Sequence, residues 1–253
     1  MGEIKPYILI SNDDGIYSNG IKALAEVAAE FGDVVLVAPD RQQSAVGHAI
    51  TLETPLRAQK MKVNGSFEGF AINGTPADSV KLAHDQLLDR KPDLVLSGIN
   101  HGSNAGINIL YSGTVSAATE GTVLGYPSIA VSCTDYDLDA DLQGCLEAAR
   151  RVIRFVLDKG LPKGVTMNVN APSGEFKGIK WARMADSQYV EEYDARKDPV
   201  GRPYYWMSGR FELLDDGNDA DINILNDGFA TVTPIQYDLT DYDLLRKMGE
   251  ESF

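Results

Sequence analysis

The 253-residue sequence has only two cysteines, Cys133 and Cys145, which are too few for a disulfide framework and are not spaced as zinc ligands. Both are expected to be small buried hydrophobic residues of a protein from a reducing compartment. The first residues lack the basic segment and long apolar run of a signal peptide, and no apolar stretch approaches transmembrane length. These absences predict a cytoplasmic protein that is neither exported nor embedded in a membrane.

Positive charge is also scarce, since 23 Lys and Arg face 37 Asp and Glu and the net charge is −14. A nucleic-acid polymer is therefore not an expected partner, because its phosphate backbone binds basic surfaces. A small anionic substrate would need a local source of positive charge, and a bound metal ion can supply it. Apolar residues make up 43% of the chain, which is typical of a globular protein and argues against disorder.

Two common phosphate-binding motifs are missing as well. No G-x-G-x-x-G follows the first apolar run, which argues against a dinucleotide cofactor. No Gly-Lys-Ser/Thr completes a Walker loop. Any phosphate site in this chain must therefore be built in another way.

The chain does have a clear alternation of strand and helix signals over residues 1–171. The predicted strands are 7–11, 34–37, 94–96, 129–131 and 165–169, and the predicted helices are 21–31, 75–88, 116–124 and 142–157. Alternation of this kind predicts an α/β fold with a mostly parallel sheet covered by helices on both faces.

Two stretches depart from the alternation. Residues 41–74 predict a loop and a hairpin inserted into the core, with short strands near Ile50, Leu56 and Phe70. Residues 172–253 are rich in Tyr, Asp and Gly, with a late strand at 230–233. We interpret them as a β-rich, oligomerising extension of the 1–171 core, packed on the sheet or on a partner subunit and not an independent domain. The alternative is a lid that selects the substrate.

Two adjacent aspartates, Asp13 and Asp14, follow the first predicted strand and precede the turn residue Gly15. Adjacent carboxylates repel each other, and their unpaired burial is unfavourable. A divalent cation would hold both ionised at the carboxyl end of the strand, where open α/β sheets bind ligands. An isolated Asn-Asp-Asp-Gly is more often a solvated turn. The metal hypothesis therefore depends on similar loops at other strand ends.

Such loops do follow the next two strands of the alternation. Ser44 lies after the second strand, and Asn100 ends the third. With Asp13 and Asp14 they offer carboxylate, hydroxyl and amide oxygens, a set that suits Mg²⁺ or Mn²⁺ and does not suit structural zinc. Taken singly, a loop serine or asparagine is usually a local hydrogen-bonding residue.

A candidate phosphate site lies at Ser112-Gly113-Thr114, which opens a predicted helix. The first turn of a helix presents unpaired backbone N–H groups and the positive end of the dipole to an anion. The alternative is a plain helix cap. In the preceding loop, His101 is a candidate general acid or phosphate ligand, or else a structural hydrogen-bonding residue.

Five motifs together resemble those of the survival protein SurE family: Asn-Asp-Asp-Gly at 12–15, and the segments 38–44, 74–78, 97–102 and 111–115. They occur in the family's order over about residues 7–132. The resemblance implies a Rossmann-like three-layer α/β/α sandwich. It also implies an extension exchanged between the subunits of a homodimer or homotetramer.

The same resemblance implies a metal-dependent phosphatase of nucleoside 5′- and 3′-monophosphates, with a further activity on short polyphosphate in some members. It assigns one Mg²⁺ or Mn²⁺ per subunit to Asp13, Asp14, Ser44 and Asn100. It assigns phosphate contacts to Asn104, Ser112, Gly113 and Thr114, to which we add His101 as a candidate. We predict Asp13, Asp14 and Asn104 to be the catalytic residues. Either aspartate could act as a general base or as a nucleophile.

Two other functions compete with this one. A phosphotransferase of the haloacid-dehalogenase type forms an aspartyl-phosphate, but it places its two aspartates one residue apart and needs a downstream lysine. A nucleotide-sensing module on the same fold would bind nucleotides without releasing phosphate, since a fold alone does not prove an activity.

Overall fold

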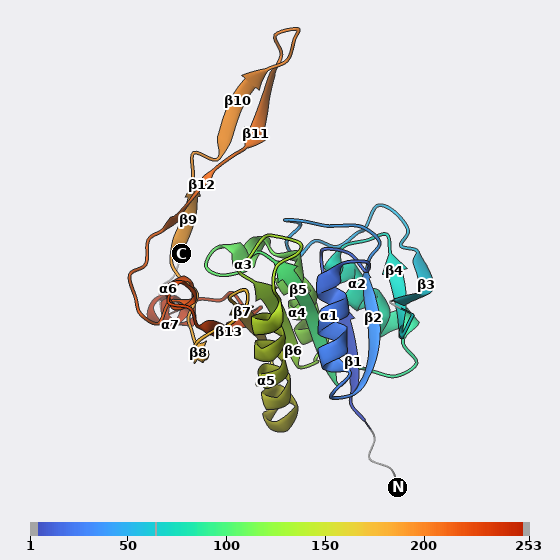
Figure 1. Ribbon diagram of the computed structural model, residues 1–253. Coiled ribbons are helices and arrows are strands. Elements are labelled where there is room, and N and C mark those ends of the chain that lie inside the picture. Colours follow the sequence, from blue (N-terminus) through green and yellow to red (C-terminus); the bar gives the residue numbers. More distant parts are fainter. Residues whose placement is uncertain (1–4, 64, 250–253) are drawn as a thin grey trace.

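A computed structural model describes residues 5–63 and 65–249 (Figure 1). Its centre is a nine-stranded sheet with the strand order β3-β4-β2-β1-β5-β6-β7-β13-β8. The strands are β1 (Tyr7–Ser11), β2 (Asp33–Pro39), β3 (Ala58–Val63), β4 (Phe67–Ile72), β5 (Leu94–His101), β6 (Ser128–Cys133), β7 (Val165–Ala171), β8 (Ile179–Trp181) and β13 (Ala230–Gln236). In this order, every pair of neighbouring strands from β4 to β7 is parallel. Strand β3 pairs antiparallel with β4, and β13 pairs antiparallel with β7.

Helices cover both faces of this sheet, because its central strands are apolar on both sides. On one face, α1 (Asn19–Ala28) and α5 (Gln143–Lys159) bury their apolar stripes against Ile8, Leu94 and their neighbours. On the other face lie α2 (Pro76–Leu82), the π-helical turn η1 (Ala83–Leu87) and α4 (Gly113–Val123). The predicted α/β sandwich with a mostly parallel sheet is confirmed.

Local sequence signals explain where the helices begin. The side chain of Thr75 accepts a hydrogen bond from Asp78 N at 3.0 Å, and Pro76 occupies the first turn, so α2 starts where the sequence predicts. The η1 turn carries the same helical segment on to Leu87. In α5, Cys145 is buried, and Cys133 is buried in β6; both are free thiols, as predicted.

The 41–74 insertion is partly as predicted. Strands β3 and β4 form an antiparallel hairpin at the edge of the sheet, and Phe70 lies in β4. The strand predicted near Ile50 is wrong, because this residue lies in a loop, and the strand predicted near Leu56 begins two residues later, as β3 at Ala58. This loop is held by side-chain contacts, among them Thr51 Oγ1 donating to Asp78 Oδ2 at 2.6 Å, rather than by a strand ladder.

The extension contributes to the same sheet and then leaves it. Strands β8 and β13 complete the sheet, while β9 (Ser187–Val190) pairs with β12 (Arg210–Leu213), and β10 (Tyr193–Lys197) pairs with β11 (Pro203–Met207). Figure 1 shows this second pair, which we call the arm, projecting away from the body of the molecule. The extension also contains α6 (Asp221–Asn226) and α7 (Tyr242–Met248). The division of the chain at residue 171 stays a prediction.

Among the described residues, the helices are too short or too polar to cross a membrane.

Candidate metal and phosphate site

The parallel strands β1, β2, β5 and β6 end at one edge of the sheet, and the predicted site residues gather there. The turn after β1 is fixed from within: Asn12 Nδ2 donates to Ser18 Oγ at 2.8 Å and to Gly15 O at 3.2 Å. Gly15 has a φ of +93°, a conformation that side-chain-bearing residues rarely adopt. This turn presents Asp13 and Asp14 to the carboxyl edge.

Asp13 is buried against the first turn of α4. Its Oδ1 accepts a hydrogen bond from Thr114 Oγ1. A Cβ placed on Gly113 would lie 2.7 Å from Asp13 Cβ, so only glycine allows the helix to approach this closely. Burial is the main cause that raises the pKa of Asp13 to about 6; the Thr114 hydrogen bond lowers the pKa and the charge of Asp14 contributes to the rise. A nearby cation would favour the ionised form.

Asp14 is half-buried and lies beside His101. Gln42 Nε2 is 3.4 Å from its Oδ1, while its Oδ2 is buried and finds no hydrogen-bond donor among the described residues. Burial raises the pKa of Asp14, partly offset by the charge and backbone N–H of His101. No hydrogen bond satisfies this buried carboxylate oxygen. A metal ion would satisfy it, so Oδ2 fits the role of a cation ligand.

Asn100 and His101 end β5 next to these aspartates. Asn100 Nδ2 donates to Gly102 O at 2.7 Å and to His101 O at 3.3 Å. With the amide nitrogen engaged in this turn, the amide oxygen is the atom left to a cation. The Nδ1 atom of His101 is buried and unpartnered within the described part of the chain.

The loop that carries Ser44 is joined to the site on two sides. Gln43 N donates to Asp13 O at 2.7 Å, and Gly47 N donates to Tyr111 O at 3.1 Å. Ser44 itself is exposed. The structure therefore brings the loop to Asp13, and the role of the Ser44 hydroxyl as a metal ligand stays a prediction.

The segment Ser112-Gly113-Thr114 opens α4, as predicted. Ser112 is the N-cap, since its Oγ accepts from Val115 N at 3.0 Å. The hydroxyl and the backbone N–H of Thr114 both face the Asp13 carboxylate, so the first turn of α4 holds this aspartate. The segment therefore caps the helix and directs the positive end of the helix toward Asp13, and its role as a phosphate site stays a prediction.

Asn104 lies further along the edge, over the ends of β6 and β7. Its Nδ2 donates to Ser132 Oγ at 2.8 Å, and its backbone N donates to Asn170 Oδ1 at 2.7 Å. Its carbonyl accepts from Asn168 Nδ2 at 2.7 Å and from Asn170 Nδ2 at 3.2 Å. These three buried partners were missed from the sequence. The available signal was Asn at two alternate positions, 168 and 170, of a buried strand.

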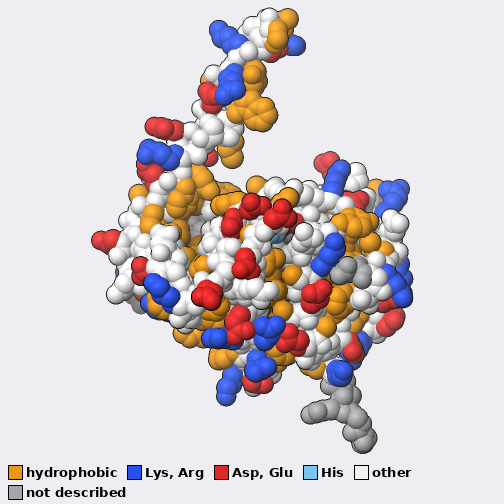
Figure 2. Space-filling model, in the orientation of Figure 1, with side chains coloured by type: hydrophobic (Ala, Val, Ile, Leu, Met, Phe, Trp, Pro, Cys, Tyr) orange, Lys and Arg blue, Asp and Glu red, His pale blue; other side chains and the backbone are white. Residues whose placement is uncertain are grey.

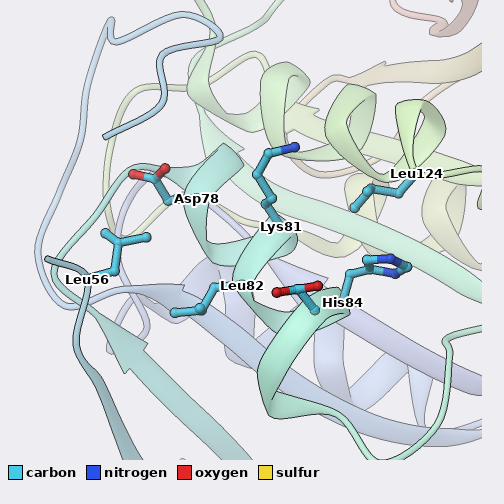
Figure 3. Close-up of a pocket in the computed structure, with 7 residues that line it drawn as sticks. Leu56, Asp78, Lys81, Leu82, His84 and Leu124 are labelled. Carbon is cyan, nitrogen blue, oxygen red and sulfur yellow. The ribbon is translucent and has the colours of Figure 1, made fainter. Parts of the chain in front are cut away.

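A second polar cluster lies on α4 away from the aspartates. Glu120 is buried, and its carboxylate accepts from His48 Nε2 at 2.8 Å and from Lys81 Nζ at 2.7 Å. Lys81 also borders a pocket of about 510 Å³ between α2, the Leu56 loop and Leu124 (Figure 3). Beside it, His84 contacts the Tyr126 hydroxyl. No residue of the predicted site lines this pocket.

Within residues 5–63 and 65–249, no three His, Cys, Asp or Glu side chains form a metal-binding group. A cation at the sheet edge would thus depend on the two aspartates together with neutral oxygens. Such a mixed oxygen set is typical of Mg²⁺ and Mn²⁺.

Comparison with known proteins identifies the family. The profile of the family described as "Survival protein SurE" matches residues 8–191. This chain belongs to the SurE family. The resemblance seen in the five sequence motifs is therefore confirmed.

Members of the family match along the whole chain. A protein of Christiangramia forsetii is 45% identical and covers 100% of this chain and 99% of its own. One of Cytophaga hutchinsonii is 47% identical and covers 98% and 97%. Both are named "5′-nucleotidase SurE". The crystal structure of the SurE protein from Aquifex aeolicus is 40% identical, with a TM-score of 0.83 over 96% of this chain and 98% of that one.

Proposed function

We propose that this chain is a divalent-metal-dependent phosphatase that hydrolyses nucleoside 5′- and 3′-monophosphates. The prediction of a 5′-nucleotidase is confirmed by the full-length relatives of that name. The observation that carries the chemistry is the placement of the buried Asp13 against the first turn of α4, with the half-buried Asp14 next to it. This arrangement combines carboxylates for a cation with a helix N-terminus for an anion.

Asp13, Asp14, Asn100 and Ser44 are the residues that would hold one Mg²⁺ or Mn²⁺. When bound, the ion supplies positive charge for the transferred phosphoryl group and lowers the pKa of a coordinated water. The fit rests on the unpartnered Oδ2 of Asp14 and on the orientation of the Asn100 amide.

The chain's own groups would bind and orient the phosphate. The backbone N–H of Gly113 would donate to one of its oxygens at the positive end of α4, in the turn that Ser112 and Thr114 hold in place. Asn104 would contact the same group through its side-chain amide. Thr114 fixes the rotamer of Asp13, and Asp13 or Asp14 would take a proton or attack the phosphorus. His101, which lies beside Asp14, would donate a proton to the leaving oxygen.

The test is phosphate release from AMP, 3′-AMP and short polyphosphate by the purified chain, with Mg²⁺, with Mn²⁺ and with excess EDTA. Release from both nucleotides that stops in EDTA supports the proposal. Activity that persists in EDTA contradicts the metal. Tight AMP binding without release would point to the sensing module, and a trapped phosphoenzyme would point to the phosphotransferase.

We also propose that the chain works as a homo-oligomer assembled through the arm. In the β10–β11 register, Tyr193 lies opposite Met207 and Ala195 lies opposite Tyr205, so these side chains share one face. Tyr193, Tyr205 and Met207 are each more than 60% exposed, and Figure 2 shows hydrophobic side chains along the arm. An isolated two-stranded hairpin is only marginally stable, and an exposed apolar face of this kind is expected to be buried against a partner. A second copy of the chain is the proposed partner that buries this face.

A further inference from the structure

Asp221 is a fully buried carboxylate that the proposed reaction does not use. It is the first residue of α6, in the extension. Its Oδ1 accepts hydrogen bonds from Ala185 N at 3.0 Å and Ile222 N at 2.8 Å. Its Oδ2 accepts from Gly106 N at 3.0 Å. One carboxylate thus joins the extension to the loop between β5 and α3 (Asn108–Tyr111).

Two further contacts join the same parts. Ile107 N donates to Ser187 Oγ at 2.9 Å, and Tyr189 Oη donates to Asn108 Oδ1 at 2.9 Å. The packing is close, because a Cβ on Gly106 would lie 2.5 Å from Ser187 Oγ and 2.8 Å from the side chain of Ile222. Three successive residues of the loop, 106–108, are therefore held by the extension.

The other side of the loop is held by the sheet. Two residues before Gly106, the backbone N–H and carbonyl of Asn104 form hydrogen bonds with the side-chain amides of Asn168 and Asn170 in β7. The loop segment 104–108, which we call the phosphate loop, is thus fixed between the sheet and the extension. It leads through α3 directly to Ser112, the N-cap of α4. Any shift of this loop would move both Asn104 and the first turn of α4.

We propose that Asp221 is a positioning residue for substrate binding: through the N–H of Gly106 it fixes the phosphate loop, so that Asn104 and the start of α4 meet the phosphate together. Ser187 supports the same loop through Ile107. The inference rests on the proposed function of the site. It gives the extension a part in substrate binding, although the extension supplies none of the proposed contacts to metal or phosphate.

The test uses the full chain with Asp221→Asn. The amide keeps the volume of the carboxylate but replaces one acceptor oxygen by an N–H₂ group, which faces N–H donors. We expect the KM for AMP and the inhibition constant of inorganic phosphate to rise about tenfold, as the loss of one charged hydrogen bond implies. The Mn²⁺ concentration for half-maximal activity should stay unchanged, since Asp221 does not contact the metal residues.

Two more variants separate positioning from general destabilisation. Ser187→Ala removes the acceptor of Ile107 N, together with a longer hydrogen bond of 3.4 Å from Ser187 Oγ to Ala185 O, and should shift both constants in the same direction by a smaller factor. Asp215→Asn is the matched control: this carboxylate binds Arg183, Asp186 N and Gly217 N in the extension without touching the phosphate loop. It should lower the melting temperature and leave both constants unchanged.

The proposal is overturned if Ser187→Ala and a folded Asp221→Asn bind phosphate as the unchanged chain does, or if Asp215→Asn weakens binding equally. Should Asp221→Asn not fold, Ser187→Ala decides alone. Calorimetric AMP binding and hydrogen exchange of the Gly106 and Ile107 amides provide readouts without turnover. If the unchanged chain released no phosphate, the proposed function would fail, whereas weaker AMP binding and faster exchange in the variants would still support the positioning role.

Discussion

At the scale of single residues, Asp13 and Asp14 are adjacent in the chain but have different hydrogen-bond partners. Asp13 is fixed by Thr114 and closely covered by Gly113, whereas Asp14 keeps a buried oxygen without a donor. The two carboxylates therefore differ in freedom: Asp13 is held by Thr114, whereas Asp14 is contacted by Gln42 at 3.4 Å and keeps one oxygen for a ligand. A cation between them would complete the set.

We predict that Asp13→Asn and Asp14→Asn each lower kcat for AMP at least about 100-fold, because each removes a negative charge from the proposed cation ligands. Both variants should remain folded, since an uncharged amide relieves the repulsion within the pair. Phosphate release and a thermal melt check this. Asp33→Asn, at the opposite end of β2, is the control and should keep full activity. An Asp14→Asn variant with normal kcat would contradict the metal site.

Gly113→Ala is predicted to reduce activity by about tenfold or more while leaving most of the fold intact, because the new methyl would lie 2.7 Å from Asp13 Cβ and push the carboxylate from the helix. The expected sign is a rise in the KM for AMP together with a fall in kcat. Steady-state kinetics measure both. Unchanged kinetics would mean that the close approach of α4 to Asp13 has no part in the reaction.

The residues that sequence reasoning found and those it missed differ in a physical way. Asp13, Asp14 and Asn100 stand directly after apolar strands, so their meeting at one edge follows from a parallel sheet. Asp221 meets Gly106 across 115 positions of the chain, and no periodicity encodes that contact. The Asn168 and Asn170 amides likewise acquire their role only when the loop at Asn104 folds over β7.

At the scale of elements, α4 joins the site to the 41–57 loop. Its residue Glu120 binds His48 of that loop and Lys81 of α2, and the same loop reaches Asp13 through Gln43. Burial alone would raise the pKa of Glu120, but the hydrogen bonds from His48 and Lys81 outweigh it and lower the pKa below its ordinary value. A carboxylate with a lowered pKa stabilises the fold above its unfolded-state pKa.

We therefore predict that Glu120→Gln lowers the free energy of unfolding by about 1–3 kcal/mol at pH 7, as expected for a charged hydrogen bond whose partners are partly exposed. The difference between the two proteins should shrink as the pH falls through the pKa of Glu120 in the folded state, below about 4.5. Urea unfolding at pH 7 and at pH 4 or below measures it. Equal stabilities at pH 7 would contradict a stabilising role of this cluster.

The elements themselves were predicted where apolar periodicity is strong. The strands β1, β2, β5, β6 and β7 follow from their apolar runs, and the helices α1 and α5 follow from their apolar periodicity. The helix α2 was predicted from the cap signals of Thr75 and Pro76, and α4 from its small residues. The strands of the arm were not predicted, because residues in β10 and β11 are exposed on both faces and show no burial pattern. The formation of such a hairpin depends on side-chain pairs across the two strands and on the surface that packs against them. Neither can be identified from a single sequence.

At the scale of the whole molecule, the arm and the phosphate loop are linked by the extension. Strand β9 contacts the loop through Ser187 and Tyr189, and the chain continues from β9 into the arm. An oligomer that buries the arm would thus also restrict the motion of β9 and β12, which lie between the arm and the phosphate loop. Oligomerisation and substrate binding are expected to respond together.

Replacing Tyr205 and Met207 by Ser should convert the proposed oligomer to a monomer, because both side chains lie on the apolar face of the arm, which has no cover within the described chain. Light scattering after size exclusion measures the mass, and AMP hydrolysis by the same sample measures the link to the site. Leu52→Ser is the control, since Leu52 is 84% exposed but lies in the 41–57 loop. A change of mass with no change in KM would separate assembly from the phosphate loop. An unchanged chain that already runs as a monomer would remove the arm as an interface, because its apolar face would then be stable in water without a partner.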